Sequence, residues 1–170
     1  MELSYRETWA LIHGVVLGGL FLLAFVGGLA ELYALRPAAA TPSGLRTSAR
    51  RKGIGITSMA VVAWVTVITG TWVVYPWYRD PAADSPRSTL LADPTTEGLH
   101  TFGMEWKEHI AWISPILATV AAFLVLHYGP GLARNIRLRR VTIVVFVVAF
   151  AAAATAGALG ALIAESAPVS

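Results

Sequence analysis

Among the few ionisable residues inside otherwise apolar stretches of the chain, four have a regular spacing that makes them candidates for chemistry. His13 and Glu31 share one stretch, and His109 and His127 share another. Each pair is separated by eighteen residues, which is five whole helical turns and about 27 Å of rise. Each pair is therefore expected on one face of its helix. Because hydrocarbon disfavours ionisable groups, we predict that both faces turn inward. His13 would then face His109, and Glu31 would face His127.

Two facing histidines can bind the iron of a b-type haem from opposite sides. The chain has no cysteine, which is no obstacle because a b-type haem is held without covalent attachment. Glycines near His13, Gly14 and Gly18 among them, would leave room for the ring. The same Gly14-x-x-x-Gly18 spacing also suits plain helix–helix packing.

The arrangement resembles the four-helix membrane b-type cytochromes, in which alternate helices contribute paired histidine ligands. The resemblance covers the four apolar stretches and the two residues His13 and His109. Members with two haems usually carry a second histidine pair about fourteen residues along the same helices. Here Glu31 and His127 stand five turns away instead. The resemblance therefore implies one haem b, held by His13 and His109.

Other chemistry is open to residues near His109. Imidazole and thioether ligands suit copper, so His100, Met104, Glu105, His109 and His13 are alternative ligands of a transition metal. Glu105 and His109 stand one helical turn apart, on the same side of a helix.

The acidic residues of this segment have a second interpretation. Glu105 and Glu108 would stabilise a helix N-terminus, with Lys107 reaching the lipid headgroups. In a quinol-oxidising protein the same two carboxylates could accept protons. Glu31 and His127 also have two interpretations. They could take part in proton or quinone chemistry, or they could have structural roles, such as an ion pair between Glu31 and Arg36.

The elements that must position these residues are four apolar stretches, each long enough to span a membrane as a helix. Hydrophobic residues make up 56% of the 170-residue chain, and the mean hydropathy is +0.63. We therefore predict an all-α integral membrane protein, a four-helix up-down bundle in a single transmembrane domain over residues 1–170. The expected spans are residues 8–35, 53–75, 106–128 and 141–164.

The charges of the connecting segments predict the orientation. Residues 36–52 and 134–140 carry only basic charges, whereas the segment between spans two and three is rich in Asp and Glu. Because short basic loops stay in the cytoplasm, both termini and the loop over residues 76–105 are expected outside a bacterial plasma (inner) membrane. The net charge of +3 then reflects topology and lipid headgroups, and nucleic acid is not an expected partner.

The outer loop, residues 76–105, is the largest segment outside the spans. Pro76, Pro81, Pro86 and Pro94 are expected to exclude regular structure from it. Tyrosines and tryptophans gather at its two ends, as in an interfacial aromatic belt. A partner surface or a quinone-binding rim is the alternative for the same residues.

These features favour a membrane-embedded electron-transfer subunit. Its haem b would pass electrons between quinol and an extracytoplasmic redox protein or other membrane subunits. A cofactor-free accessory or scaffold subunit of a larger complex is the main alternative. A small transporter lined by the polar faces is a third interpretation. The chain has no nucleophile elbow and no phosphate-binding glycine loop, so a complete enzyme is not expected.

Overall fold

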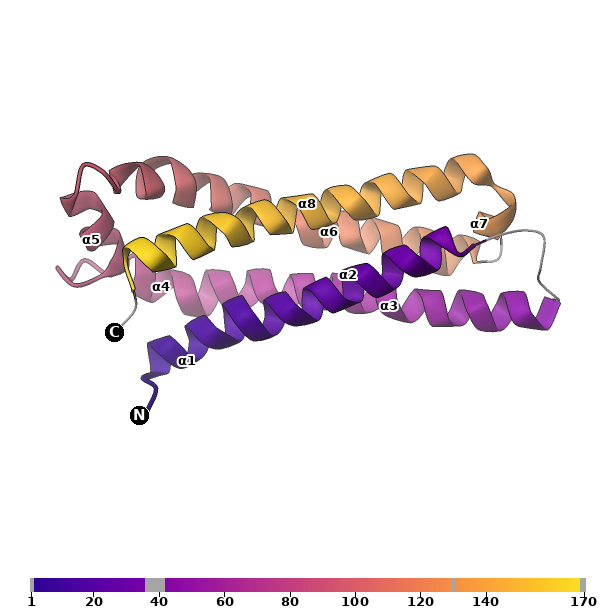
Figure 1. Cartoon of the computed structure of the whole chain (residues 1–170), viewed down its shortest axis with the longest axis horizontal. Coiled ribbons are helices and arrows are strands. Elements are labelled where there is room, and N and C mark those ends of the chain that lie inside the picture. Colours follow the sequence, from indigo (N-terminus) through magenta and orange to yellow (C-terminus); the bar gives the residue numbers. More distant parts are fainter. Residues whose placement is uncertain (1, 36–41, 130, 169–170) are drawn as a thin grey trace.

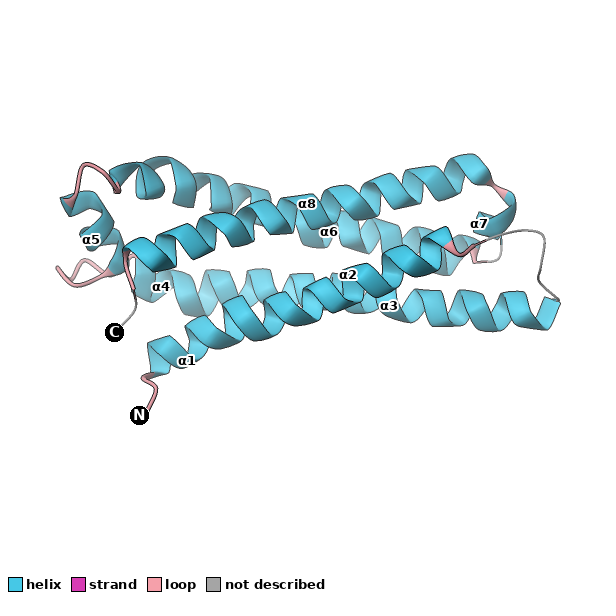
Figure 2. Ribbon diagram, in the orientation of Figure 1, coloured by secondary structure: helices cyan, strands magenta, loops and turns pink. Residues whose placement is uncertain are grey.

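The computed structural model describes residues 2–35, 42–129 and 131–168, and among them the side chains outside residues 42–52. This part of the chain is helical and contains no strand (Figure 2). Arg36, the expected partner of Glu31, lies outside the described residues. So do the side chains of the basic run that ends at Lys52.

Four helical segments are long and apolar enough to cross a membrane, as predicted. They cover Tyr5–Tyr33, Gly53–Tyr78, Leu99–Tyr128 and Ile136–Ser166. Span one joins α1 (Tyr5–Leu11), the π-helical turn η1 (Ile12–Val16) and α2 (Leu17–Tyr33). Span two joins α3 (Pro42–Thr69), the π-helical turn η3 (Gly70–Val74) and α4 (Tyr75–Tyr78). Span three joins the π-helical turn η4 (Leu99–Met104) to α6 (Glu105–Tyr128), and span four is α8 (Ile136–Ser166).

The four spans form an elongated bundle in which α6 packs against both α8 and α3, and α3 in turn packs against α2 (Figure 1). Small residues of α6, Ala118, Ala121 and Ala122, are buried in this core. Span one is the least enclosed. Within it the buried residues are Phe21, Gly28 and Leu32, all from α2.

Two kinds of contact hold α2 to its neighbours. Phe25 stacks on Phe150 of α8 with ring centroids 3.9 Å apart. At Gly28 the backbones come close, because a Cβ added there would lie 2.9 Å from Phe146 Cζ and 3.0 Å from Ile56 Cγ1. Glycine is therefore required at this crossing for steric reasons.

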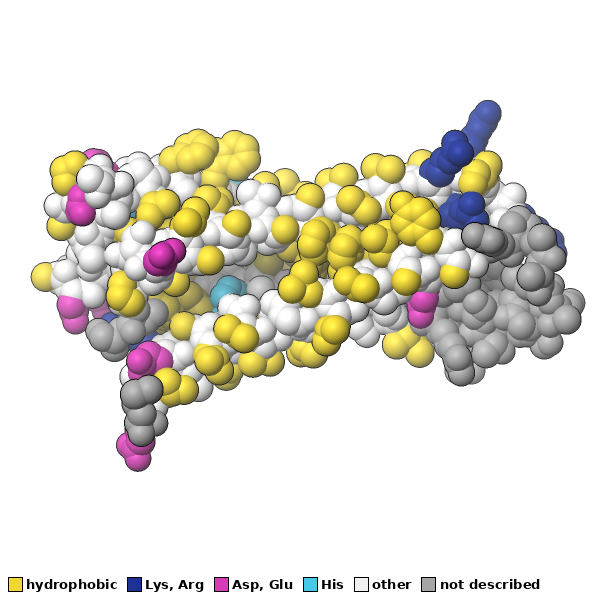
Figure 3. Space-filling view, in the orientation of Figure 1, with side chains coloured by type: hydrophobic (Ala, Val, Ile, Leu, Met, Phe, Trp, Pro, Cys, Tyr) yellow, Lys and Arg dark blue, Asp and Glu magenta, His cyan; other side chains and the backbone are white. Residues whose placement is uncertain are grey.

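The two ends of the bundle differ in charge. We call the end that holds both termini and residues 79–98 the loop end, and the opposite end, next to α7 (Gly131–Arg134), the basic end (Figure 1). On the face shown in Figure 3, acidic side chains lie mainly near the loop end and Lys and Arg mainly near the basic end, with apolar side chains between them. At the basic end Arg139 of α8 donates a hydrogen bond to the carbonyl of Leu35.

The prediction that prolines exclude regular structure from residues 76–105 is wrong. Pro76 lies in the first turn of α4, and Pro86 begins the short helix α5 (Pro86–Ala92) after the N-cap Ser85. Proline is tolerated at the start of α5 because the first N–H groups of a helix have no partner within it. Pro76 instead lies directly after the π-helical turn η3, where the helical hydrogen-bond pattern of span two changes. The loop is therefore short, and η4 extends span three beyond its predicted start.

Candidate ligand site at the loop end

His13 lies in the π-helical turn η1 and contacts span two. Its Nδ1 is 3.2 Å from Thr69 Oγ1, and the Thr69 hydroxyl donates to the carbonyl of Val65 at 2.8 Å. When the Thr69 hydroxyl donates to Val65, its oxygen accepts from Nδ1 of His13, because a hydroxyl has one hydrogen. The neutral imidazole then carries its proton on Nδ1 and keeps the lone pair of Nε2. No hydrogen bond of Nε2 to a described residue is recorded.

Gly70 makes room for this ring. A Cβ at Gly70 would lie 2.9 Å from His13 Cε1 and 3.5 Å from Nε2. Span two therefore passes directly beside the imidazole, at the first residue of its own π-helical turn, η3. π-Helical turns in long helices are frequent at functional sites.

Lys107 is the second polar side chain at this level. It is half-buried, and its stem lies against α8, where a Cβ at Gly160 would be 3.0 Å from Lys107 Cε. Its ammonium is close enough for its charge to act on the imidazole of His13. The side chain therefore packs within the bundle, between α6 and α8.

The Lys107 ammonium has no ion pair in the described part of the chain. The recorded pairs there join Arg6 to Asp80, and Arg79 to Glu105 and Glu108. Glu108 acts on Lys107 through its charge without hydrogen-bonding it. Withdrawing an ammonium from water costs several kcal/mol, so a side chain in this position indicates a site that attracts an electron-rich partner.

Arg79 organises the polar residues between this site and the loop. Its Nη2 lies 2.6 Å from Glu105 Oε1 and 3.4 Å from Glu108 Oε1. Its Cζ lies 4.9 Å from the ring centre of Tyr75. The hydroxyl of Tyr75 also donates to Glu108 at 3.1 Å. Burial alone would lower the pKa of Arg79, but Glu108, Tyr75 and Glu105 together raise it. Arg79 therefore stays charged and ties span two to the start of α6.

His13 and His109 are not brought together. His109 is exposed, and its Nδ1 donates to the carbonyl of Glu105 in the preceding turn at 2.6 Å. It stands two residues from Lys107, about 200° around the helix. Because Lys107 packs toward α8, His109 points away from the interior. The residues present therefore do not fit a haem held between His13 and His109 of one chain.

His127 lies on the same outward face of α6 as His109. It is exposed and stacks on Phe123 with ring centroids 5.2 Å apart. Glu31 instead lies toward α3, where a Cβ at Gly55 would be 3.7 Å from its Oε2. The eighteen-residue spacing thus places the two histidines on one face, but Glu31 and His127 do not face each other.

The residues of the alternative metal site have other partners. His100 is buried and its Nδ1 lies 2.9 Å from the Tyr78 hydroxyl, while Met104 is buried in an apolar cluster that includes Tyr78. Glu105 is engaged by Arg79. Within the described residues no group of three or more His, Asp or Glu side chains is placed to hold a metal ion.

The glycines expected to flank a cofactor face open space. A Cβ at Gly14 or Gly18 would meet no atom within 4 Å in the described structure. Neither glycine is therefore used for packing within this part of the chain. Sequence reasoning also missed Thr69 and Gly70 as neighbours of His13. The signal for Lys107 was present, since it is one of few charges inside an apolar stretch.

No family model, curated protein or solved structure matches this chain.

Proposed function

We propose that this chain is a membrane subunit that binds the head group of a quinone-type carrier at the loop end of its bundle and serves electron transfer in a larger complex. The observation that carries the proposal is the half-buried Lys107 ammonium, which lies against α8, has no ion pair among the described residues and acts through its charge on the imidazole of His13. Quinone carbonyl oxygens accept hydrogen bonds from such a cation, and a neutral imidazole accepts a proton from a quinol.

The packing of span one supports entry of such a ligand from the lipid. No residue of α1 or η1 is buried, so the side of the bundle next to His13 is weakly enclosed. A carrier dissolved in the membrane would reach the head-group site laterally. Its electrons would pass to or from a redox centre in a partner subunit.

The orientation belongs to the same proposal. Basic residues gather at the end opposite the site, and basic segments stay in the cytoplasm of bacteria. The head-group site would then lie toward the outer face of the plasma membrane. Protons released from a quinol would leave past Glu108 and Tyr75 toward the loop.

Binding of a short-chain quinone to the purified protein tests the proposal, with quenching of tryptophan fluorescence as the readout. Lys107→Met should weaken binding by about 10- to 100-fold, since a hydrogen bond to a charged group contributes about 1.5–3 kcal/mol. His13→Gln should weaken it by about 2- to 10-fold, since a hydrogen bond between neutral groups contributes about 0.5–1.5 kcal/mol. His109→Gln is the matched control and should bind like the parent protein, because His109 points outward.

Equal binding by all four proteins would refute the head-group site. A haem absorption band that disappears in both histidine variants would instead favour a haem bound by both side chains, against the geometry described above.

A cofactor-free accessory subunit is the second candidate function. It is favoured by the open glycines of span one and by small exposed residues on α8, such as Ala154 and Gly157. Such faces allow close contact with helices of another membrane protein. Failure of the parent protein to bind any quinone, together with stable capture of a membrane partner, would support this candidate.

A further inference from the structure

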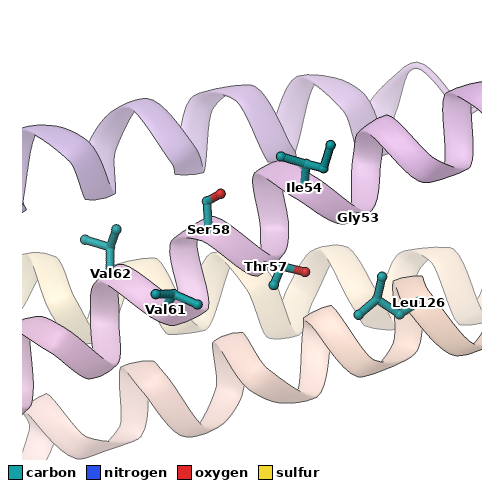
Figure 4. A pocket seen from close by; sticks show the side chains of 7 residues that line it. All are labelled: Gly53, Ile54, Thr57, Ser58, Val61, Val62 and Leu126. Carbon is teal, nitrogen blue, oxygen red and sulfur yellow. The ribbon is translucent and has the colours of Figure 1, made fainter.

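A groove on the surface of the bundle lies far from the polar site. It has a volume of about 560 Å³ and is lined by α3 residues and by Leu126 of α6 (Figure 4). This volume is within the range of about 300–1,000 Å³ that small-molecule sites occupy. The lining residues are Gly53, Ile54, Thr57, Ser58, Val61, Val62 and Leu126.

Most of the groove is apolar and open to the surroundings. Ile54, Val61 and Leu126 are 65%, 56% and 63% exposed. At one end the two helices come close, because a Cβ at Gly53 would lie 2.8 Å from Leu126 Cδ2. The groove therefore offers an apolar channel in the span-two surface, suited to a hydrocarbon chain.

Thr57 adds a polar feature to this lining. Its Oγ1 is buried, and no hydrogen-bond partner for it is recorded among the described residues. A hydroxyl without a partner is unfavourable in hydrocarbon. An oxygen-bearing ligand in the groove would satisfy it.

Positive charge lies at the same end of the molecule. The sequence immediately before Gly53 reads Arg50-Arg51-Lys52, and Arg134 and Arg137 near the start of α8 are exposed. Thr57 stands five residues after Lys52 along α3, a rise of about 7.5 Å. A phospholipid has this order of groups: an anionic phosphate, ester oxygens a few ångströms deeper, and then acyl chains.

From these observations we infer that the groove is a binding site for one anionic phospholipid. Its phosphate would lie at the basic end, an ester oxygen would accept a hydrogen bond from Thr57, and one acyl chain would lie along Val61 and Val62. Basic sites between transmembrane helices on the cytoplasmic side bind anionic head groups in this manner. The inference does not depend on the quinone site, which lies at the other end of the bundle.

Native mass spectrometry of the full-length protein, delipidated in detergent, tests the inference. Phosphatidylglycerol and phosphatidylcholine with identical acyl chains are added in separate titrations. The parent protein should retain one phosphatidylglycerol at several-fold higher occupancy than phosphatidylcholine. Val61→Trp, which fills the groove, should reduce that occupancy at least fivefold.

Val26→Trp is the matched control, because Val26 is 63% exposed on α2, outside the groove. Thr57→Val keeps the side-chain shape, removes the hydroxyl and should reduce phosphatidylglycerol occupancy even if Val61→Trp fails to fold. Equal occupancy of the two lipids in the parent protein would overturn the inference. Undiminished phosphatidylglycerol binding by Thr57→Val and by folded Val61→Trp would also overturn it.

Discussion

At the scale of single residues, Arg79 has the most contacts with charged groups at the loop end. It pairs with Glu105 and Glu108 at the start of α6 and lies over the ring of Tyr75. The pairs are partly exposed, with the side chains of Arg79, Glu105 and Glu108 36%, 45% and 26% accessible. Water and salt therefore screen much of the attraction, and each pair contributes little alone.

Replacing Arg79 should destabilise the protein modestly. Arg79→Met is expected to lower the free energy of unfolding by about 1 kcal/mol, because two carboxylates lose their partner while remaining partly solvated. Thermal unfolding in detergent, followed by circular dichroism, measures the change. The difference from the parent protein should shrink at high salt. A difference that does not depend on salt would show that Arg79 acts by packing instead of charge.

At the scale of helices, close approach is confined to a few positions. Span one carries five glycines, and of these Gly28 has atoms of neighbouring helices within 4 Å of an added Cβ. Gly27, its neighbour in sequence, faces open space. The two adjacent glycines therefore have different roles: one permits the crossing of α2 with α3 and α8, and the other does not take part in it.

Alanine substitution separates these roles. Gly28→Ala should destabilise the bundle by about 1–3 kcal/mol, because the ring of Phe146 and the side chain of Ile56 must move. Gly27→Ala should be neutral or stabilising by up to about 1 kcal/mol, because alanine favours a helix and its Cβ would have no atom of a neighbouring helix within 4 Å. Unfolding curves of the two variants, measured side by side, make the comparison. Equal destabilisation by both would contradict the crossing described here.

At the scale of the whole molecule, the bundle is polarised between its ends. Residues 79–98 and both termini lie at one end, and α7 with the start of α8 lies at the other (Figure 1). The proposed quinone site belongs to the first end and the proposed phospholipid site to the second. Both proposals therefore depend on the same orientation in the membrane.

Single cysteines test that orientation cleanly, because the chain has none of its own. Ala83→Cys, at an exposed position of the loop end, should react with a membrane-impermeant maleimide on intact bacterial cells. Ile136→Cys, 47% exposed at the basic end, should react only after permeabilisation, because the proposed orientation places the basic segments in the cytoplasm. The reverse labelling pattern would invert the orientation and place the quinone site on the cytoplasmic side.

The sequence by itself determined the elements and their internal geometry. Four apolar stretches of sufficient length predict four spans, and the structure contains four such helices. Helical periodicity likewise placed His109 and His127 on one face of α6, because eighteen residues are five whole turns. The secondary structure of residues 76–105 was predicted less well. Pro86 begins the helix α5, since a proline in the first turn of a helix does not prevent the helix from forming.

The tertiary structure alone decided which face of each helix turns inward. Periodicity relates residues within one helix but does not fix the rotation of that helix about its axis. In α6 the small residues Ala118 and Ala121 allow the close packing of α3 and α8, and this rotation turns His109 outward. It also turns Lys107 toward α8, so the proposed head-group site pairs His13 with a lysine, whereas the sequence predicted a second histidine as its partner.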